Sequence, residues 1–287
     1  MKVLVLGAAG MIGSAMFSVL SQSSKIEVWG GIRTGTSKKY FTPSLTDKLT
    51  VTGDIDKSDQ LVRAFAAIEP NVVVNCVGLT KHRKEADDPM QAIPLNAVLP
   101  HRMADLCKAS GARLIHISSD CVFAGTKGNY LEMDAPDATD IYGRTKCLGE
   151  AVTYPHAVTL RTSTIGHEFD STYGLLEWFL SQKGTCKGFS RAVFSGLPNN
   201  VFAQIVRDIV IPRPELCGLF HVGAEPIGKY DLLQLIAREY GKTIDIVRDD
   251  AFVIDRSLNP ARFNAATGYK APAWPELIRL MHASRQA

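Results

Sequence analysis

The sequence lacks the features that would assign it to several common classes of protein. None of its apolar stretches approaches the roughly 18 residues that a membrane-spanning helix needs. The N-terminal apolar run ends at Gly7 without the cleavage site of a secretory signal. Basic residues form no run, and the net charge of +3 over 287 residues is too small to favour nucleic acid. We therefore expect a cytoplasmic protein that binds neither membranes nor nucleic acid.

Cysteines are few and widely separated, and the sequence has no Cys-x-x-Cys pair among its 6 cysteines. Metal sites and the disulfide scaffolds of small secreted proteins cluster their cysteines. We therefore expect free thiols and no bound metal. Hydrophobic residues, in contrast, make up 46% of the chain, which is enough for a full globular core.

Short β-branched runs alternate with amphipathic stretches in the first part of the chain. The predicted strands cover residues 3–6, 26–32, 49–52, 72–75, 114–118 and 158–161, and the predicted helices cover 11–21, 58–67, 93–109 and 141–151. Strands that are apolar on both faces and separated by helices form a parallel sheet with helices on both sides. Since crossovers in such sheets are right-handed, the sequence predicts an α/β fold with a doubly wound, Rossmann-like sheet.

The pattern loosens after about residue 166, where glycine and proline become more frequent. Further helices are predicted at 200–211, 229–240 and 276–283. We predict a dinucleotide-binding domain over residues 1–165. A smaller C-terminal substrate-binding lobe, partly interwoven with the first domain, is predicted over residues 166–287.

A glycine-rich loop joins the first predicted strand to the first helix. It reads Gly7-Ala8-Ala9-Gly10-Met11-Ile12-Gly13. In such loops the first glycine allows a tight turn, the second lets the backbone approach a pyrophosphate, and the third lets the helix pack closely on the strand. The N-terminus of the helix adds N–H donors and a positive dipole. The sequence therefore predicts a site for a dinucleotide, with a simple strand–turn–helix joint as the alternative.

The second strand is predicted to end near the adenosine ribose, where NAD enzymes usually have an acid. Here the strand ends at Arg33, with Lys38 and Lys39 close behind and no acid expected in reach. An arginine pairs well with a 2′-phosphate. We therefore expect NADP(H) as the preferred cofactor and NAD(H) as the second choice. A solvated basic loop is the alternative. Further cofactor contacts are expected after the third and fourth strands, at Asp54, Ile55, Cys76, Val77 and Gly78.

A tyrosine and a lysine four residues apart, Tyr142 and Lys146, share one face of a predicted helix. A free tyrosine has a pKa of about 10, and a neighbouring ammonium lowers this pKa because it favours the phenolate. The strand at 114–118 leads into Ser119, whose hydroxyl is suited to binding a substrate carbonyl. The sequence therefore predicts a catalytic set of Ser119, Tyr142 and Lys146, with an unrelated surface pair as the alternative.

The chain resembles the extended short-chain dehydrogenase/reductase family in the ordered set of Gly7-x-x-Gly10-x-x-Gly13, Ser118-Ser119-Asp120 and Tyr142-x-x-x-Lys146. More narrowly, residues 117–125 (ISSDCVFAG), 142–150 (YGRTKCLGE), 160–163 (LRTS) and 218–222 (GLFHV) resemble the dTDP-4-dehydrorhamnose reductase subfamily. Thr164 stands where that subfamily often has a tryptophan. The resemblance implies reduction of a 4-keto group on a nucleotide-linked deoxysugar with NADPH or NADH. It also implies that Ser119 and Asp120 match the subfamily's Thr-Asp pair, and it allows a homodimer.

Cys121 suggests an alternative enzymatic function, that of an epimerase or epimerase/reductase. GDP-fucose synthases, an epimerase/reductase branch of the same family, have a cysteine acid/base at the matching position and a histidine after the sixth strand, where this chain has His167. A thiol and an imidazole can remove and return a proton beside a keto group. In the alternative interpretation, which we favour, Cys121 is a small packing residue and His167 a loop residue.

Several other residues are candidates for substrate contacts. Thr80 begins the run Thr80-Lys81-His82-Arg83 after the fourth strand, and Arg256 and Arg262 lie where extended family members often bind the diphosphate. Ion pairs of these arginines with Asp255 or Glu276 are the alternative. The predicted substrate-binding set is Thr80, Asp120, Cys121, Arg161, His167 and Arg256. A non-catalytic, dinucleotide-binding regulatory subunit is a further alternative, and the complete catalytic set argues against it.

Overall fold

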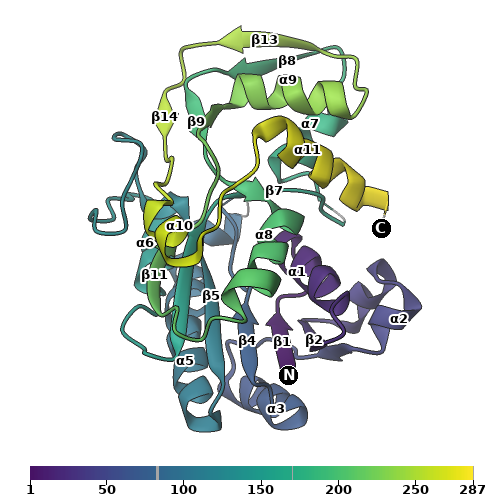
Figure 1. Ribbon diagram of the computed structural model, residues 1–287, viewed down its shortest axis with the longest axis vertical. Helices are drawn as coiled ribbons and strands as arrows, with labels where there is room; N and C mark the ends of the chain where they lie inside the picture. The colour runs from purple at the N-terminus through teal and green to yellow at the C-terminus, as the bar shows by residue number, and fades with distance from the viewer. Residues whose placement is uncertain (82–83, 170, 287) are drawn as a thin grey trace. The chain divides into compact units, whose positions relative to one another are not determined.

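The six runs predicted as strands form one sheet in the computed structural model, which describes residues 1–81, 84–169 and 171–286 (Figure 1). A seventh strand, at Gly218–His221, was not predicted and completes this sheet. The strands are β1 (Lys2–Leu6), β2 (Glu27–Ile32), β3 (Leu49–Val51), β4 (Val72–Asn75), β5 (Arg113–Ser119), β6 (Ala157–Thr162) and β11 (Gly218–His221). Their order is β11-β6-β5-β4-β1-β2-β3, and β1 pairs in parallel with both β2 and β4. A sheet that grows outward on both sides of its first strand is doubly wound, and the predicted fold class is confirmed.

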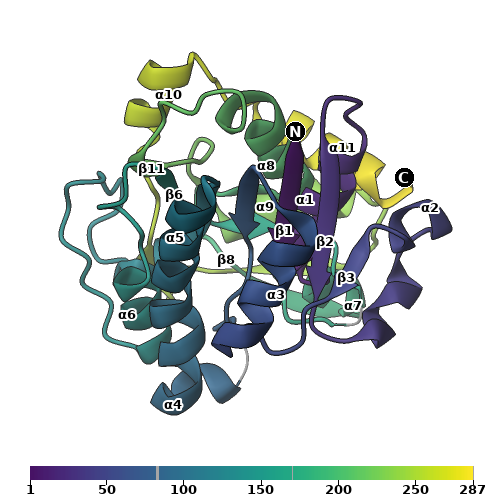
Figure 2. The ribbon, with the colours of Figure 1, turned by 90° about the horizontal axis from the view of Figure 1, so that it is seen from below.

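Helices cover both faces of this sheet because its strands are apolar on both faces. Leu4 and Leu6 of β1 share a core cluster with α3 (Ser58–Ile68) and α5 (Leu99–Ser110), which stand beside one another in Figure 2. Val3 and Val5 alternate with them and are equally buried, on the opposite face. α1 (Met11–Ser21) packs on β1 and β2. The predicted helix at 11–21 is therefore confirmed.

The chain divides into two compact units. The first consists of Met1–Ser118, Thr139–Leu160 and Ala203–Leu219, and the second of Ser119–Ala138, Arg161–Phe202 and Phe220–Ala287. The sequence passes several times between the units. The predicted boundary after residue 165 stays a prediction.

Short strands and helices make up most of the second unit. The strands are β7 (Thr164–Ile165), β8 (Thr185–Phe189), β9 (Ala192–Phe194), β10 (Leu197–Pro198), β12 (Ile227–Gly228), β13 (Asp245–Asp249) and β14 (Ile254–Asp255). The helices are α7 (Leu175–Ser181), α9 (Lys229–Glu239), α10 (Ala261–Thr267) and α11 (Trp274–Ala283). β8 and β13 pair in parallel, and α9 lies along them (Figure 1).

Two predicted helices are divided by π-helical turns. The helix predicted at 93–109 begins as the π-helical Ile93–Val98 and continues as α5. The helix predicted at 200–211 is α8 (Asn199–Ile205) followed by the π-helical Val206–Val210. The remaining short helical segments are Gly35–Tyr40, α2 (Pro43–Thr46), Lys84–Asp87, α4 (Pro89–Ala92), Asp120–Val122 and Ser284–Gln286. In the described part of the chain no helix combines the length and apolar character that a bilayer-spanning segment requires.

The helix predicted at 141–151 is shorter than expected. α6 (Ile141–Leu148) ends before Gly149, where a Cβ would lie 1.9 Å from the carbonyl oxygen of Asn96. A side chain at this position would displace the neighbouring π-helical turn. The close approach of the two backbones therefore requires glycine at position 149.

Candidate functional site

The glycine-rich loop has the geometry expected of a phosphate-binding turn. Gly7 follows β1 with φ of +79°, a conformation that favours glycine. A Cβ on Gly13 would lie 2.1 Å from the Gly7 carbonyl oxygen, so the first turn of α1 can approach the loop only with glycine there. The two glycines bring the N-terminus of α1 close to the end of β1.

The N-terminus of α1 fits an anion such as a pyrophosphate. Gly10 precedes the helix without a capping side chain, and the first turn contains no acidic residue. A Cβ on Gly10 would meet only the Gly7 carbonyl oxygen, at 3.4 Å, so the loop leaves space on that side. Met11 and Ile12 are half-buried in the first turn. A backbone without a blocking side chain at a positive helix end is the arrangement that dinucleotide pyrophosphates occupy.

An acid does lie in reach of Arg33, and the expectation that none would was wrong. Arg33 Nε lies 2.6 Å from Asp54 Oδ1, and both side chains are exposed. β2 and β3 are neighbours in parallel register, with Ile32 opposite Val51, so the residues after the two strands meet at one edge of the sheet. Ile55, next to Asp54, is buried.

The segment after β4 lies between the glycine-rich loop and α6. A Cβ on Gly7 would lie 3.0 Å from the Cys76 carbonyl oxygen, and one on Gly78 would lie 3.9 Å from Lys146 Nζ. The Val77 N–H donates to Asn75 Oδ1 over 3.0 Å. The structure thus brings Gly7, Cys76, Gly78 and Lys146 together at the carboxyl edge of the sheet.

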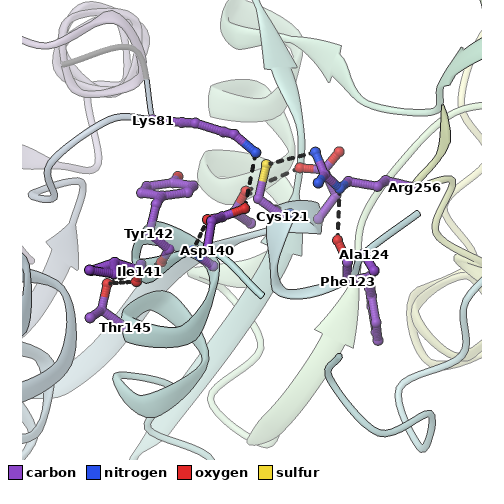
Figure 3. A network of polar contacts seen from close by, with 12 residues as sticks. Lys81, Cys121, Phe123, Ala124, Asp140, Ile141, Tyr142, Thr145 and Arg256 are labelled. Carbon is purple, nitrogen blue, oxygen red and sulfur yellow. Dashed lines mark hydrogen bonds and ion pairs between the residues drawn. The ribbon is translucent and has the colours of Figure 1, made fainter. Parts of the chain in front are cut away.

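α6 carries both Tyr142 and Lys146, as predicted from their spacing. Asp140 caps the helix, since its Oδ1 accepts from the Gly143 N–H over 2.8 Å. Lys81 Nζ lies 3.1 Å from Asp140 Oδ2 (Figure 3). Sequence reasoning missed Asp140, although an aspartate just before a helical pattern is a known start signal. Tyr142 is half-buried in the first turn.

Lys146 is nearly inaccessible, with 5% of its surface exposed. Its Nζ donates to the Ile117 carbonyl oxygen over 2.8 Å. Burial lowers the pKa of Lys146 to about 8, and electrostatic interaction with Glu150, and with the thiolate form of Cys76, raises it. Burial also raises the pKa of the Cys76 thiol, to about 12. The pKa of Lys146 therefore lies close to neutral pH, so that a small further decrease in this pKa would remove the charge of the side chain.

Asn96 is a buried link that the sequence did not reveal. It lies in the π-helical turn before α5 with 1% of its surface exposed. Its Oδ1 accepts from the Leu79 N–H over 2.9 Å, and its Nδ2 lies 3.3 Å from Thr145 Oγ1. Asn96 thus joins the segment after β4 to the middle of α6. A single asparagine in an apolar run gives no signal of such a role.

Ser119 ends β5, and its hydroxyl is held by its neighbours. Ser119 Oγ accepts from the Cys121 N–H over 3.1 Å and lies 3.1 Å from Asp120 Oδ1. Burial raises the pKa of Asp120, while Ser119 and Arg256 lower it. The three consecutive residues Ser119, Asp120 and Cys121 thus form a compact polar group in the second unit.

Arg256, which directly follows β14, contacts this group. Its Nε donates to the Phe123 carbonyl oxygen over 2.7 Å, and its Nη1 lies 3.8 Å from Cys121 Sγ (Figure 3). Glu276, one of the partners considered for Arg256, is paired with Arg279 over 2.6 Å. The guanidinium therefore orients the chain at Cys121 and Phe123.

His167 lies in the loop after β7 with a partner at each ring nitrogen. Nδ1 is 2.7 Å from Glu177 Oε1, and Nε2 is 3.0 Å from the Tyr240 hydroxyl. Burial raises the pKa of Tyr240. Arg256 contacts Cys121, whereas Glu177 and Tyr240 contact His167. The favoured interpretation of Cys121 as a packing residue stays a prediction, with the acid–base pair as its alternative.

The remaining candidates differ in exposure. Arg161 is buried in β6, with Nη1 3.3 Å from His221 Nε2 and its guanidinium 5.1 Å from the Phe123 ring centre. Thr80 is exposed, and Arg262 stacks 4.9 Å from the Phe220 ring centre. His82 and Arg83 lie outside the described residues.

Comparison with known proteins identifies a family and several relatives. The model of the RmlD substrate binding domain matches residues 1–188. Methionine adenosyltransferase 2 subunit beta of Rattus norvegicus is 29% identical over 256 residues, which cover 82% of this chain and 71% of that protein. The dTDP-4-dehydrorhamnose reductase of Mycolicibacterium smegmatis is 33% identical over 57% of this chain and 46% of its own length.

Solved structures share the fold over the whole chain. A dTDP-4-dehydrorhamnose reductase from Clostridium acetobutylicum has a TM-score of 0.82 at 22% identity, with 100% of both chains covered. A dTDP-4-dehydrorhamnose reductase from Bacillus anthracis, solved in complex with NADP, has a TM-score of 0.80 at 18% identity over 99% of both chains. At these identities the likeness concerns the fold.

Proposed function

Because the chain belongs to the RmlD substrate binding domain family, we propose that it is an NAD(P)H-dependent reductase of a nucleotide-linked 4-keto-deoxysugar. The observation that carries the proposal is α6, on which Tyr142 lies one helical turn before the buried Lys146. The relatives named as dTDP-4-dehydrorhamnose reductases support the same reaction.

The residues at the carboxyl edge of the sheet fit a nicotinamide dinucleotide. Gly7, Gly10 and Gly13 leave the N-terminus of α1 open to a pyrophosphate. Lys146 lies beside the segment after β4, and we propose that it binds a ribose hydroxyl of the cofactor. When bound, the reduced cofactor supplies a hydride to the carbonyl carbon. Relatives in fold solved with NADP and with NAD support a cofactor of this class.

Tyr142 is the proposed proton donor to the carbonyl oxygen. A tyrosine gives up its proton more easily when a cation stabilises its phenolate, and Lys146 is the proposed cation. Ser119 is proposed to orient the carbonyl with its hydroxyl, which is already fixed by Asp120 and Cys121. The transfer of one hydride and one proton converts the ketone into an alcohol.

NADPH is the proposed preferred cofactor because Arg33 offers a guanidinium at the end of β2. The ion pair with Asp54 reduces this preference, since Asp54 repels a 2′-phosphate and competes for the arginine. NADH is therefore expected to serve as well, with weaker binding. Thr80, Asp120, Arg161 and Arg256 remain proposed contacts of a nucleotide sugar.

The proposal is tested by incubating the protein with a panel of 4-keto sugar nucleotides and following NADPH and NADH absorbance. Oxidation of the cofactor with one panel member, and formation of the matching alcohol, would support a reductase. If the dinucleotide binds but is not oxidised with any member, the reductase assignment fails.

That outcome would favour a second candidate, which the relatives named as subunits of a methionine adenosyltransferase suggest. In this candidate the chain binds a dinucleotide and acts as a partner of another enzyme. Retention of Ser119, Tyr142 and Lys146 supports the reductase over this role, because a binding subunit has no need of all three.

A further inference from the structure

Glu150, four residues after Lys146, is a buried ionisable side chain that contacts the end of β5. Glu150 follows the end of α6 with 8% of its surface exposed. Its Oε1 accepts a hydrogen bond from Ser118 Oγ over 2.7 Å. Burial of a carboxylate is unfavourable unless hydrogen bonds or an opposite charge compensate it. The reductase mechanism proposed above assigns no part to Glu150 or Ser118.

Two consecutive residues of β5 bind the two ionisable side chains. The Ile117 carbonyl oxygen accepts from Lys146 Nζ over 2.8 Å, and the next residue, Ser118, donates to Glu150. A strand end that holds a buried ammonium and a buried carboxylate in adjacent positions sets their separation. The four residues Ile117, Ser118, Lys146 and Glu150 are called the strand-end clamp below.

We propose that Glu150, anchored by Ser118, is a positioning residue that keeps Lys146 in its ammonium form and so sustains the action of Lys146 on Tyr142. The proposal rests on the reductase mechanism proposed above. Without a nearby negative charge, a lysine with 5% exposure would release its proton to escape burial. A neutral lysine no longer stabilises a tyrosine phenolate.

The other ionisable groups around Lys146 do not supply this negative charge at neutral pH. Burial raises the pKa of Cys76 to about 12, so its thiol stays neutral. Burial and the charge of Lys146 lower the pKa of His116 well below its ordinary value, so its imidazole is also neutral. Among the groups that act on Lys146, Glu150 has the largest effect in favour of the charged form.

The elements packed against α6 carry few further charges. Lys81 is paired with Asp140 at the start of the helix. Glu85 and Asp87 are exposed to solvent in the short helix Lys84–Asp87. His101 of α5 contacts the Leu148 carbonyl oxygen over 2.7 Å through its ring. The described residues of the π-helical turn and α4 contain no ionisable side chain.

The test is a direct titration of Lys146 in the whole protein. Protein labelled with ¹³C at lysine Cε is titrated by NMR, and the Lys146 signal is assigned by its loss in Lys146→Arg. In wild type we expect a midpoint of about 8. Glu150→Gln, which keeps the size of the side chain and its ability to accept from Ser118, is expected to lower the midpoint by about one pH unit or more.

Two further variants control the measurement. Ser118→Ala keeps the Glu150 carboxylate but removes the hydroxyl that binds it. The Lys146 midpoint is therefore expected to fall by less than in Glu150→Gln. Glu85→Gln removes an exposed carboxylate from an element packed against α6 and is expected to leave the midpoint unchanged. If Glu150→Gln does not fold, Ser118→Ala decides the matter. An unchanged Lys146 midpoint in a folded Glu150→Gln variant overturns the proposal. Where Glu150→Gln does not fold, an unchanged midpoint in Ser118→Ala overturns it.

Activity separates this inference from the reductase mechanism. If both hold, the alkaline limb of the kcat profile of Glu150→Gln moves to lower pH together with the Lys146 midpoint, and Glu150→Asp restores part of the shift. A shifted midpoint in a protein that reduces no sugar nucleotide would refute the reductase and leave the clamp intact. If the protein is an active reductase but its Lys146 midpoint is the same in wild type and Glu150→Gln, the role of the clamp is refuted and the reductase mechanism stands.

Discussion

Arg33 and Asp54 form an ion pair, 2.6 Å between Nε and Oδ1, across the ends of the neighbouring strands β2 and β3. Both side chains are exposed, so the pair contributes little to stability. In the proposed function the pair affects ligand choice, because the two residues have opposite preferences for a 2′-phosphate. We therefore expect the pair to moderate the selection of NADPH over NADH.

The first prediction concerns this selection. Arg33→Ala is expected to weaken NADPH binding by about tenfold or more, since hydrogen bonds to charged groups contribute about 1.5–3 kcal/mol, and to leave NADH binding nearly unchanged. Asp54→Asn is the matched variant and is expected to raise the ratio of NADPH to NADH affinity. Calorimetric titration with both cofactors measures these ratios. Equal losses for both cofactors in Arg33→Ala would remove Arg33 from phosphate recognition.

The second prediction concerns the proton donor. Tyr142→Phe removes one hydroxyl and is expected to lower kcat by about 10²–10⁴-fold, the usual contribution of general acid catalysis, while dinucleotide affinity stays the same. Single-turnover rates and cofactor titration separate the two effects. Arg144→Gln, on the exposed side of the same helix, serves as the control and is expected to keep most of the rate. Turnover of Tyr142→Phe close to wild type would exclude Tyr142 from the mechanism.

The third prediction separates reduction from epimerisation. We expect a reaction in deuterated water to leave the carbon beside the keto group unlabelled, because Cys121 and His167 contact Arg256 and Glu177 respectively. Mass spectrometry of the product measures the label. Deuterium at that carbon, lost in Cys121→Ser with simple reduction retained, would instead establish an acid–base role for the thiol.

The fourth prediction concerns stability and pH. Burial, followed by the charge of Arg161, lowers the pKa of His221 to about 3, whereas a histidine in the unfolded chain has a pKa of about 6.5. Between these two pH values His221 is protonated in the unfolded state and neutral in the folded state. The free energy of unfolding should fall by about 1.4 kcal/mol per pH unit from this group as the pH drops below about 6.5.

Urea unfolding of wild type and His221→Gln at several pH values between 7 and 4 tests this prediction. The variant is expected to be less stable at pH 7, because it loses the contacts of the ring, and to show a shallower decline toward acid. The buried His116 contributes in the same direction in both proteins and does not affect the comparison. Parallel declines in the two proteins would contradict the prediction.

Local sequence patterns predicted the elements that position the site. The helix at 11–21 was predicted with its observed bounds because Gly10 interrupts the apolar pattern just before it. The spacing of Tyr142 and Lys146 predicted that they share a helix, since helical periodicity depends only on neighbours in the chain. These features are encoded within short stretches.

Contacts between distant segments were not predictable in the same way. The register of β2 and β3, which brings Asp54 to Arg33, depends on packing across the sheet. The contact of Asn96 with α6 depends on a π-helical turn that leaves no mark in an apolar run. The strands of the second unit contain two to five residues each, too few for an alternating pattern to be recognised.

The position of β11 in the sheet has a consequence for shortening the chain. A fragment that ends at residue 188, where the family match ends, would lose β11 and leave β6 as the edge of the sheet. All residues of β6 are buried in the intact protein, and an apolar strand with unpaired N–H and C=O groups is a template for self-association. The fragment would also lose the Val210 and Leu216 carbonyl oxygens that accept from Arg113 over 2.6 and 2.8 Å. Such a fragment would therefore be expected to aggregate, although it contains every glycine of the phosphate loop and the whole of α6.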